Sequence, residues 1–304
     1  MFVTLKKVLS KARKENYAVG AFNFSNMEFL QAIVSAAEKL NSPVIVQTTE
    51  GAVKYAGLKY LKALADAAVS SSSVPVVLHL DHGRDLNIIK QCIRFGWTGV
   101  MIDASLFPFE KNIQKTKKVV SLAHKKGVSV EAELGTIGGA EESVRSRKII
   151  YTDPLAAKEF VERTGIDALA VAVGTSHGAY KFKARARINL KLLKQIKKTI
   201  RIPLVLHGAS SVPLQFVKTA NKFGAKIAGA HGLPDSQLRL AIKNGINKVN
   251  TDTDLRLAFD ASVRKYLKQN PEDFDPRHIL GEARNLIQKT VEHRISICGS
   301  VNKK

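Results

Sequence analysis

Residues 76–84 read VVLHLDHGR, a run of Val and Leu that carries three titratable side chains. A proline precedes the stretch and a glycine lies near its end, which is typical of a buried strand between turns. The titratable side chains are His79, Asp81 and His82, and such groups are costly to bury without partners. We therefore expect the strand to end where partners from other parts of the chain gather.

Apolar runs of this kind recur along the chain and alternate with stretches of helical period. They cover residues 18–22, 43–47, 74–80, 99–102, 128–134, 168–173, 203–206 and 246–249. Near-continuous apolar strands separated by helices indicate a parallel sheet covered on both faces. Eight such units in 304 residues favour an α/β fold of the closed (β/α)8 TIM-barrel type over an open sheet.

No linker or low-complexity tract divides the chain, so we expect a single domain over residues 1–304. An extra helix is predicted at 4–14, before the first strand. A helical extension is predicted at 252–297, and two prolines interrupt it within 271–276.

The net charge of +22 is unusual for an enzyme. One hypothesis is a nucleic-acid-binding protein, whose affinity would fall steeply as salt rises, and another is binding to a membrane surface. The basic residues are spread over the predicted helices and not gathered in one aromatic-rich block, which favours plain solvated helix faces. A third use of the charge is to steer an anionic substrate toward its site.

Targeting and redox signals are weak. The first residues lack the apolar core and cleavage site of a signal peptide, and no apolar run is long enough to span a bilayer. Cys92 and Cys298 lack metal-type spacing and are too few for a disulfide framework. We expect a reduced, cytoplasmic protein without a membrane partner.

Polar residues follow all eight predicted strands, and in a barrel these carboxyl ends meet at one mouth. His82, His177 and His207 close the third, sixth and seventh strands. Three imidazoles with one open position suit a catalytic zinc-type ion, although each histidine alone is more often structural. His79 lies inside its strand and is predicted to pack or to support the ligands.

Two further patterns are consistent with catalysis at this mouth. The turns SHGAYKFK (176–183) and HGASS (207–211) offer backbone N–H groups that could hold an anion, or could be ordinary capped turns. Asp81 precedes a candidate ligand and could act as an acid or base. The segment ELGTIGGAEE (133–142) resembles a loop able to fold over the mouth.

The motifs LHLDHG, VEAELGTIGG, VGTSHGAY, PLVLHGAS and INKVNTDT, in this order, resemble those of the class II, metal-dependent fructose-bisphosphate aldolases. The resemblance covers nearly the whole chain. It implies a homodimeric or homotetrameric enzyme that reversibly cleaves fructose 1,6-bisphosphate to dihydroxyacetone phosphate and glyceraldehyde 3-phosphate. Zn²⁺ would polarise the ketone and stabilise the enediolate.

The resemblance also implies residue roles. His82, His177 and His207 would bind zinc, and Glu133 would lie near an alternate metal position. Asp81 would exchange the proton on the C4 oxygen, and Glu141 the proton at C3. The implied substrate contacts are Asn23, Thr49, Gly178, Lys181, Gly208, Ser210, Asn250, Asp252, Thr253, Arg256 and Arg277.

Further features follow from the same resemblance. A sodium or potassium ion would bind backbone near Gly178 and Gly208, and Arg277 would act from a neighbouring subunit. The chain departs from the family pattern at DASLF (103–107), where relatives often have His after Ser; this concerns a peripheral metal position. The tagatose-bisphosphate branch is the alternative, and Asp252 and Arg256 favour the fructose substrate.

A class I aldolase, which forms a Schiff base, would share the barrel. It needs a buried reactive lysine at a strand end, and the predicted sixth strand, ALAVAVG (168–174), has none. Trapping with borohydride would support that alternative, and loss of activity in a chelator would support the metal enzyme.

Overall fold

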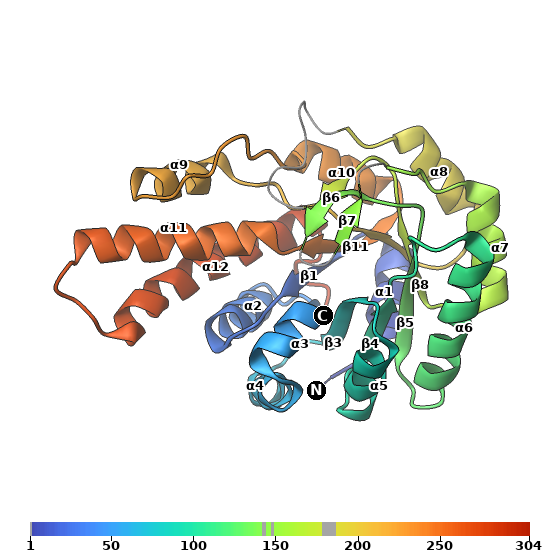
Figure 1. The fold of residues 1–304 in the computed structure, drawn as a ribbon, viewed down its shortest axis with the longest axis horizontal. Coiled ribbons are helices and arrows are strands. Elements are labelled where there is room, and N and C mark those ends of the chain that lie inside the picture. Colours follow the sequence, from blue (N-terminus) through green and yellow to red (C-terminus); the bar gives the residue numbers. More distant parts are fainter. Residues whose placement is uncertain (1, 142–143, 147–148, 178–186) are drawn as a thin grey trace.

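The computed structural model describes residues 2–141, 144–146, 149–177 and 187–304, with backbone only at 138–141, 144–146 and 177. Its centre is a closed barrel of parallel strands in the order β1-β11-β10-β8-β5-β4-β3-β2 (Figure 1). The barrel strands are β1 (Val19–Asn23), β2 (Val44–Thr49), β3 (Val76–Gly83), β4 (Gly99–Ile102), β5 (Ser129–Leu134), β8 (Ala168–Val171), β10 (Leu204–Leu206) and β11 (Ile246–Thr251). Each overlaps one predicted apolar run, so the TIM barrel is confirmed.

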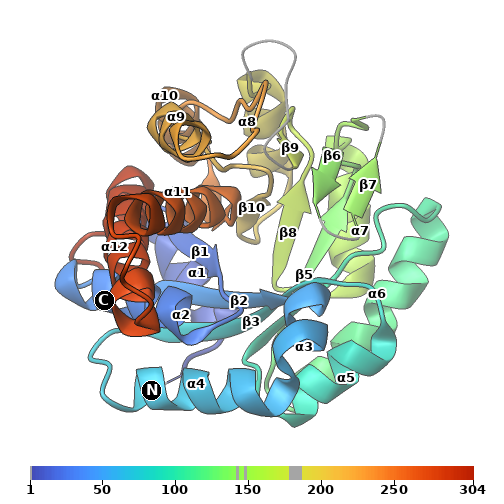
Figure 2. The same cartoon turned by 60° about the vertical axis from the view of Figure 1, so that its left-hand side comes forward.

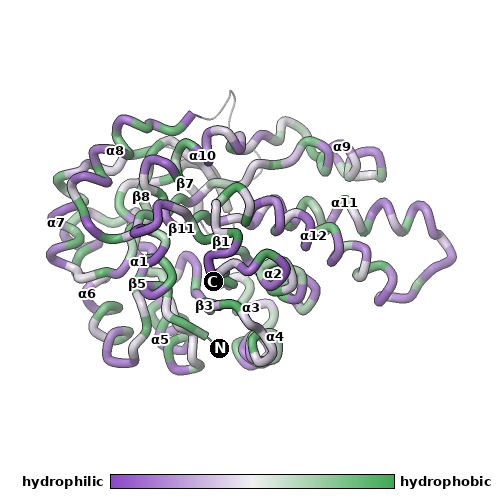
Figure 3. The backbone as a smooth tube through the Cα atoms, turned by 180° about the vertical axis from the view of Figure 1, so that it is seen from behind, coloured by the Kyte–Doolittle hydropathy of each residue, from purple (hydrophilic) through white to green (hydrophobic). Residues whose placement is uncertain are grey.

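Helices surround the barrel and cover the outer face of its strands (Figure 2). They are α2 (Met27–Lys39), α3 (Glu50–Ala56), α4 (Leu58–Ser70), α5 (Leu86–Arg94), α6 (Phe109–His124), α7 (Pro154–Thr164), α8 (Leu190–Thr199) and α10 (Asp235–Lys243). A further helix, α9 (Leu214–Lys222), lies away from the barrel and packs on α11 (Thr253–Gln269) (Figure 1). Hydrophobic and hydrophilic stretches alternate along α6, α7 and α8 (Figure 3), as expected for helices with one face on the barrel.

The predicted extra helix is α1 (Leu5–Glu15), and its N-cap is Thr4, whose side chain accepts a hydrogen bond from the Lys7 N–H. Leu5 and Leu9 of α1 are fully buried, in one cluster with inward-facing strand residues such as Val77 and Val205. The helix therefore closes the amino end of the barrel with an apolar plug. A site inside the barrel is therefore expected at the opposite, carboxyl end.

The predicted helical extension forms α11 (Thr253–Gln269) and α12 (Pro276–Cys298), which pack together and project from the barrel as an arm (Figure 1). Of the two predicted prolines, Pro271 lies in the break between the two helices and Pro276 is the first residue of α12. Phe274 lies in this turn and is 92% exposed. Most of the turn is hydrophilic (Figure 3).

One element was not expected. The segment predicted as a loop over the mouth forms β6 (Gly138–Glu141), which pairs with β7 (Val144–Ser146) and with β9 (Ser176–His177) in a separate small sheet. Gly139 lies opposite His177 in the β6–β9 register. The small sheet lies near the carboxyl end of β8 (Figure 2), so it joins two predicted site segments through their backbones.

Within the described part of the chain, no helix is long and apolar enough to cross a membrane.

Candidate metal centre and active site

The end of β3 explains why three polar side chains follow a buried strand. Successive side chains of a strand point to opposite faces, so Asp81 and His82 should face apart. However, the register between β3 and β4 shifts between Leu80 and Gly83, and His82 has a φ of 47°. Backbone in this left-handed region is strained for a residue with a side chain and is found most often at functional sites. The irregularity turns both Asp81 and His82 into the barrel mouth.

His82 meets His207, which follows β10, across the mouth. His82 Nε2 lies 3.0 Å from His207 Nδ1, and the rings meet edge to face. The other nitrogen of each ring lies next to a carboxylate and is called the outer nitrogen below. His82 Nδ1 lies 3.3 Å from Asp103, and His207 Nε2 lies 2.8 Å from Glu131. If both outer nitrogens carry protons, both inner nitrogens present lone pairs to the same point. This is the arrangement of two metal ligands held by carboxylates.

The electrostatics of the centre also favour a cation. Burial by itself would lower the pKa of His82, but Asp81, Asp103 and Glu133 raise it to about 10. Burial and the charge of His82 hold the pKa of His207 well below its usual value. The pair thus favours one positive charge, which a metal ion between the facing nitrogens would supply.

Glu133 provides an orphaned buried oxygen beside this pair. Its Oε2 lies 3.5 Å from His207 Nδ1 and accepts no hydrogen bond from the described residues. Burial and the nearby Asp103 raise the pKa of Glu133 well above its usual value. Asp81, His82 and His207 form one group able to hold an ion, and His82, Asp103 and Glu133 form another. The donor set therefore fits a divalent metal.

Three side-chain amides hold the carboxylate of Asp81. Its Oδ2 accepts from Asn23 Nδ2 at 3.2 Å and from Gln47 Nε2 at 3.1 Å, and its Oδ1 accepts from Asn250 Nδ2 at 3.0 Å. Burial would raise the pKa of Asp81, but the charges of His82, His207 and Lys248 outweigh it and lower the pKa. Asp81 is thus an oriented, ionised carboxylate beside the candidate metal ligands His82 and His207.

A cavity of about 390 Å³ opens at the mouth and is lined by Asn23, Thr49, Asp252 and Arg256, all of them predicted substrate contacts. Asp252 accepts from Arg256 Nε at 2.8 Å, and the Arg256 Nη2 lies 2.8 Å from its other oxygen. Thr49 also caps α3. The two charged side chains thus lie as one pair on the cavity wall.

The loop after β10 carries Gly208 and Ser210. Gly208 has a φ of 62°, and an added Cβ would lie 2.5 Å from the carbonyl oxygen of Ser176, so this backbone needs glycine. Ser210 Oγ accepts from the backbone N–H of Asp252 at 3.4 Å, next to Thr253, the first residue of α11. The loop and the start of α11 are therefore joined.

Asp254 and Arg294 fix the far end of this loop. The fully buried Asp254 accepts from the N–H groups of Ser211 at 3.0 Å and Val212 at 2.8 Å, and from the Ser211 hydroxyl at 3.2 Å. Val212 has a φ of 51°, which is strained for a β-branched residue. Arg294 of α12 donates to the Ala209 carbonyl at 2.8 Å and lies 3.8 Å from Asp254.

Some predicted site residues cannot be placed. Gly178 and Lys181 lie outside the described residues, and only the backbones of His177 and Glu141 are described, in β9 and β6. Arg277 is not brought to the mouth of its own chain. It is exposed in the first turn of α12, at the end of the arm, and it pairs with Asp275 at 2.6 Å.

Several residues of the centre were missed by the sequence analysis. Asp103, which follows the fourth predicted strand but was given no role, supports His82, and Gln47 holds Asp81. Lys248 of β11 is fully buried and donates to Glu131 at 2.8 Å. It lies on the last barrel strand, not on the sixth, where a Schiff-base lysine would be expected. The sequence does mark two of these residues, because a Gln interrupts the apolar run VIVQTT and a Lys interrupts the apolar run INKVNT.

His79 is fully buried, as predicted. Its Nε2 lies 3.5 Å from Glu131 Oε2, and neither ring nitrogen has a hydrogen-bond partner among the described residues. Burial and the charge of Lys248 hold its pKa well below the usual value. It is therefore a neutral ring beneath the candidate metal ligands.

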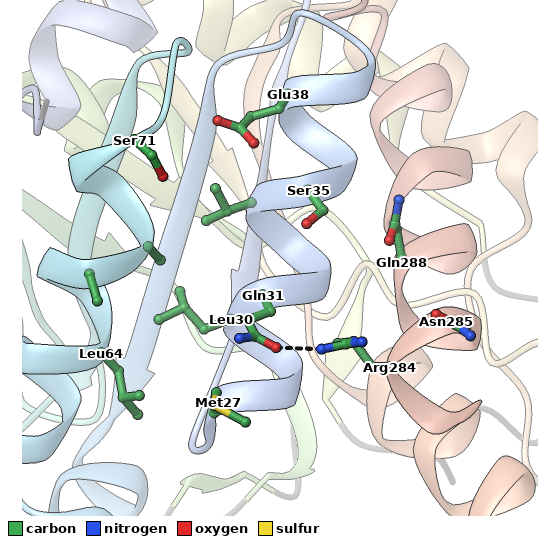
Figure 4. A pocket seen from close by; sticks show the side chains of 13 residues that line it. Met27, Leu30, Gln31, Ser35, Glu38, Leu64, Ser71, Arg284, Asn285 and Gln288 are labelled. Carbon is green, nitrogen blue, oxygen red and sulfur yellow. Dashed lines mark hydrogen bonds between the residues drawn. The ribbon is translucent and has the colours of Figure 1, made fainter. Parts of the chain in front are cut away.

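A second cavity, of about 580 Å³, lies between α2, α4 and α12 on the outside of the barrel (Figure 4). Arg284 donates to Gln31 across it at 2.7 Å. Its described lining contains a single carboxylate, Glu38, and no imidazole. The cavity therefore lacks the groups that the mouth offers for metal chemistry.

Comparisons with known proteins show which family the chain belongs to. The family model "Fructose-bisphosphate aldolase class-II" matches residues 3–303. A fructose-bisphosphate aldolase of Thermus caldophilus is 49% identical, with 100% of both chains covered. One of Giardia intestinalis is 48% identical over 98% of this chain and 93% of its own. The crystal structure of the YdjI aldolase from Escherichia coli K12 superposes with a TM-score of 0.81, at 32% identity over 100% of this chain and 99% of the other.

Proposed function

Because the chain belongs to the class II fructose-bisphosphate aldolase family, we propose that the centre on β3, β5 and β10 performs the aldol cleavage itself. The protein is a metal-dependent lyase that reversibly cleaves fructose 1,6-bisphosphate into dihydroxyacetone phosphate and glyceraldehyde 3-phosphate. The observation that supports this location is the facing pair of His82 Nε2 and His207 Nδ1, 3.0 Å apart, beside the carboxylate of Asp81.

The proposed metal ligands are His82, His207 and His177, and Glu133 would lie near an alternate position. Imidazole donors with one open position suit Zn²⁺, which we propose as the resident ion. When bound, the metal supplies a Lewis acid that polarises the ketone carbonyl of the substrate. A sodium or potassium ion near Gly178 and Gly208 is proposed from the family resemblance.

The chain's own carboxylates move the protons. Cleavage breaks the C3–C4 bond and needs a base for the C4 hydroxyl. Asp81 is oriented for this by Asn23, Gln47 and Asn250, and its lowered pKa keeps it in the ionised form that a base requires. The electron pair left at C3 then takes a proton, and we assign this step to Glu141 of β6.

Substrate binding is assigned to two regions of the mouth. The loop with Gly208 and Ser210, together with Asn250, Thr253, Gly178 and Lys181, would hold the phosphate at C1, because backbone N–H groups in such turns bind anions. The cavity lined by Asn23, Thr49, Asp252 and Arg256 would take the rest of the sugar. The far phosphate would be held by Arg256 and by Arg277 of a neighbouring subunit in a homodimer or homotetramer.

Asp252 and Arg256 favour fructose 1,6-bisphosphate over its C4 epimer, tagatose 1,6-bisphosphate. Their bidentate pair fixes both side chains on the cavity wall, where they can discriminate between epimers by position. We also propose that the enzyme works in a reducing cytoplasm, since Cys92 and Cys298 are buried free thiols.

The test compares cleavage of the two sugar bisphosphates with and without a chelator. We expect a preference for the fructose substrate, loss of activity in the chelator, and recovery with added Zn²⁺. His207→Ala should lose metal and activity, whereas the matched variant His124→Ala, on the outer helix α6, should keep both. Activity that persists in the chelator would contradict the metal centre, and a preference for tagatose would contradict the role of Asp252.

A further inference from the structure

Lys248 lies where a barrel strand would ordinarily carry an apolar residue. It belongs to β11, is fully buried, and lies opposite Val19 of β1 and Val205 of β10. Both neighbours belong to the apolar cluster inside the barrel. An ammonium group in such surroundings is costly without a charged partner.

The partner of Lys248 is Glu131 of β5, on another part of the barrel wall. The Lys248 Nζ donates to Glu131 Oε2 at 2.8 Å, and both side chains are fully buried. The other oxygen, Oε1, lies 2.8 Å from His207 Nε2. Lys248, Glu131 and His207 therefore form a continuous chain of hydrogen bonds that crosses the barrel interior.

These hydrogen bonds determine which nitrogen of His207 faces the mouth. An ionised carboxylate only accepts hydrogen bonds, so His207 donates its Nε2–H to Glu131. The lone pair of Nδ1 then points toward His82 Nε2, at 3.0 Å, and toward Glu133, at 3.5 Å. The Lys248 ammonium occupies the second oxygen of Glu131 and so limits rotation of the carboxylate away from the imidazole.

We propose that Lys248 is a positioning residue of the metal centre: acting through Glu131, it holds His207 with Nδ1 directed at the metal. The inference rests on the proposed function, because it takes His207 as a metal ligand. Stability alone does not account for the pair, since a buried ion pair replaced by well-packed apolar side chains is often neutral or stabilising. A role in orienting His207 explains why Lys248 and Glu131 are both present inside the barrel.

The experiment measures affinity for Zn²⁺ by chelator competition, in the full-length enzyme and its variants. It also records the visible spectrum of the Co²⁺-loaded protein, which reports ligand geometry, and the melting temperature of the metal-free protein. Lys248→Met should weaken Zn²⁺ binding about 10- to 100-fold, the usual effect of removing a group that orients a metal ligand. The Co²⁺ spectrum should change as well. Lys248→Arg, which keeps a cationic donor, should recover most of the affinity.

The matched control is Lys39→Met. Lys39 pairs with Glu292 at the same distance, 2.8 Å, but on the outer surface, where its side chain is 61% exposed. This variant should bind Zn²⁺ as the wild type does.

Lys248→Met leaves Glu131 buried without its cation and could unfold the barrel. The double variant Lys248→Met/Glu131→Gln removes both charges together and should fold, yet still bind Zn²⁺ at least 10-fold more weakly. Wild-type affinity and an unchanged Co²⁺ spectrum in folded Lys248→Met or in the folded double variant would overturn the inference. If His207→Ala also bound Zn²⁺ normally, the proposed metal centre itself would be wrong, so the two failures are distinguishable.

Discussion

Replacing Asp254 by Asn tests whether the buried carboxylate under the loop after β10 supports substrate binding. Asp254 accepts three hydrogen bonds, two from backbone N–H groups and one from the Ser211 hydroxyl. Asn has the same size but only one acceptor oxygen, and its NH₂ group would face a backbone N–H. The substitution thus removes one or two of these bonds and leaves a buried donor unpaired.

The magnitude follows from these contacts. A hydrogen bond to a charged group contributes about 1.5–3 kcal/mol, so Asp254→Asn should lower the free energy of unfolding by about 2–4 kcal/mol. For a chain of this size, the melting temperature should fall by roughly 5–10 °C. Because the loop with Gly208 and Ser210 is the proposed phosphate site, the KM for fructose 1,6-bisphosphate should also rise several-fold.

Thermal unfolding and steady-state kinetics give the two readouts. The control is Asp260→Asn on the same helix, since Asp260 pairs with Arg264 at a half-exposed position. Such a pair is worth at most about 1 kcal/mol, and KM should not change. If Asp254→Asn melted at the wild-type temperature with the wild-type KM, Asp254 would not hold the loop.

Two further results are expected. Asp81→Asn keeps the size of the side chain but removes the proposed base, so kcat should fall about 10²- to 10⁴-fold. The metal content, measured by elemental analysis, should stay the same. A fall in kcat smaller than tenfold would show that another group takes the C4 proton. Burial raises the pKa of Cys92 to about 12 and that of Cys298 to about 11, so both thiols keep their protons above pH 9 in the native state, whereas unfolded thiols ionise there. The free energy of unfolding should therefore decrease as pH rises above about 9. A thiol reagent at pH 8 should label neither cysteine until denaturant is added. Labelling of the native enzyme would contradict the burial of the two thiols.

The barrel was predictable because its strands are buried on both faces and so appear as continuous apolar runs. The small sheet of β6, β7 and β9 was not, since its strands are only two to four residues long and β6 begins with two glycines. The pairing of Gly139 with His177 depends on backbone contacts between distant segments. Local patterns carry no information about such pairing.

The candidate site was likewise predictable only in part. His82, His207 and Asp81 were identifiable because polar residues at strand ends converge in a barrel. Lys248 was not identified, because its partner Glu131 lies 117 residues away and only the closed barrel brings the two together. The inward turn of His82 likewise depends on a register shift against β4, which the sequence VVLHLDHGR does not reveal.

The pairing of β1 with β11 also has a consequence for how the enzyme is made. The first and last barrel strands are hydrogen-bonded neighbours, for example at Ala21 and Asn250. On a ribosome that adds about 5–20 residues per second, the N-terminal strand waits roughly ten seconds or more for its partner. Two of the three amides that hold Asp81 come from these strands, Asn23 from β1 and Asn250 from β11. The set of amides around the proposed base is therefore complete only near the end of translation, and we expect shorter nascent chains to be inactive.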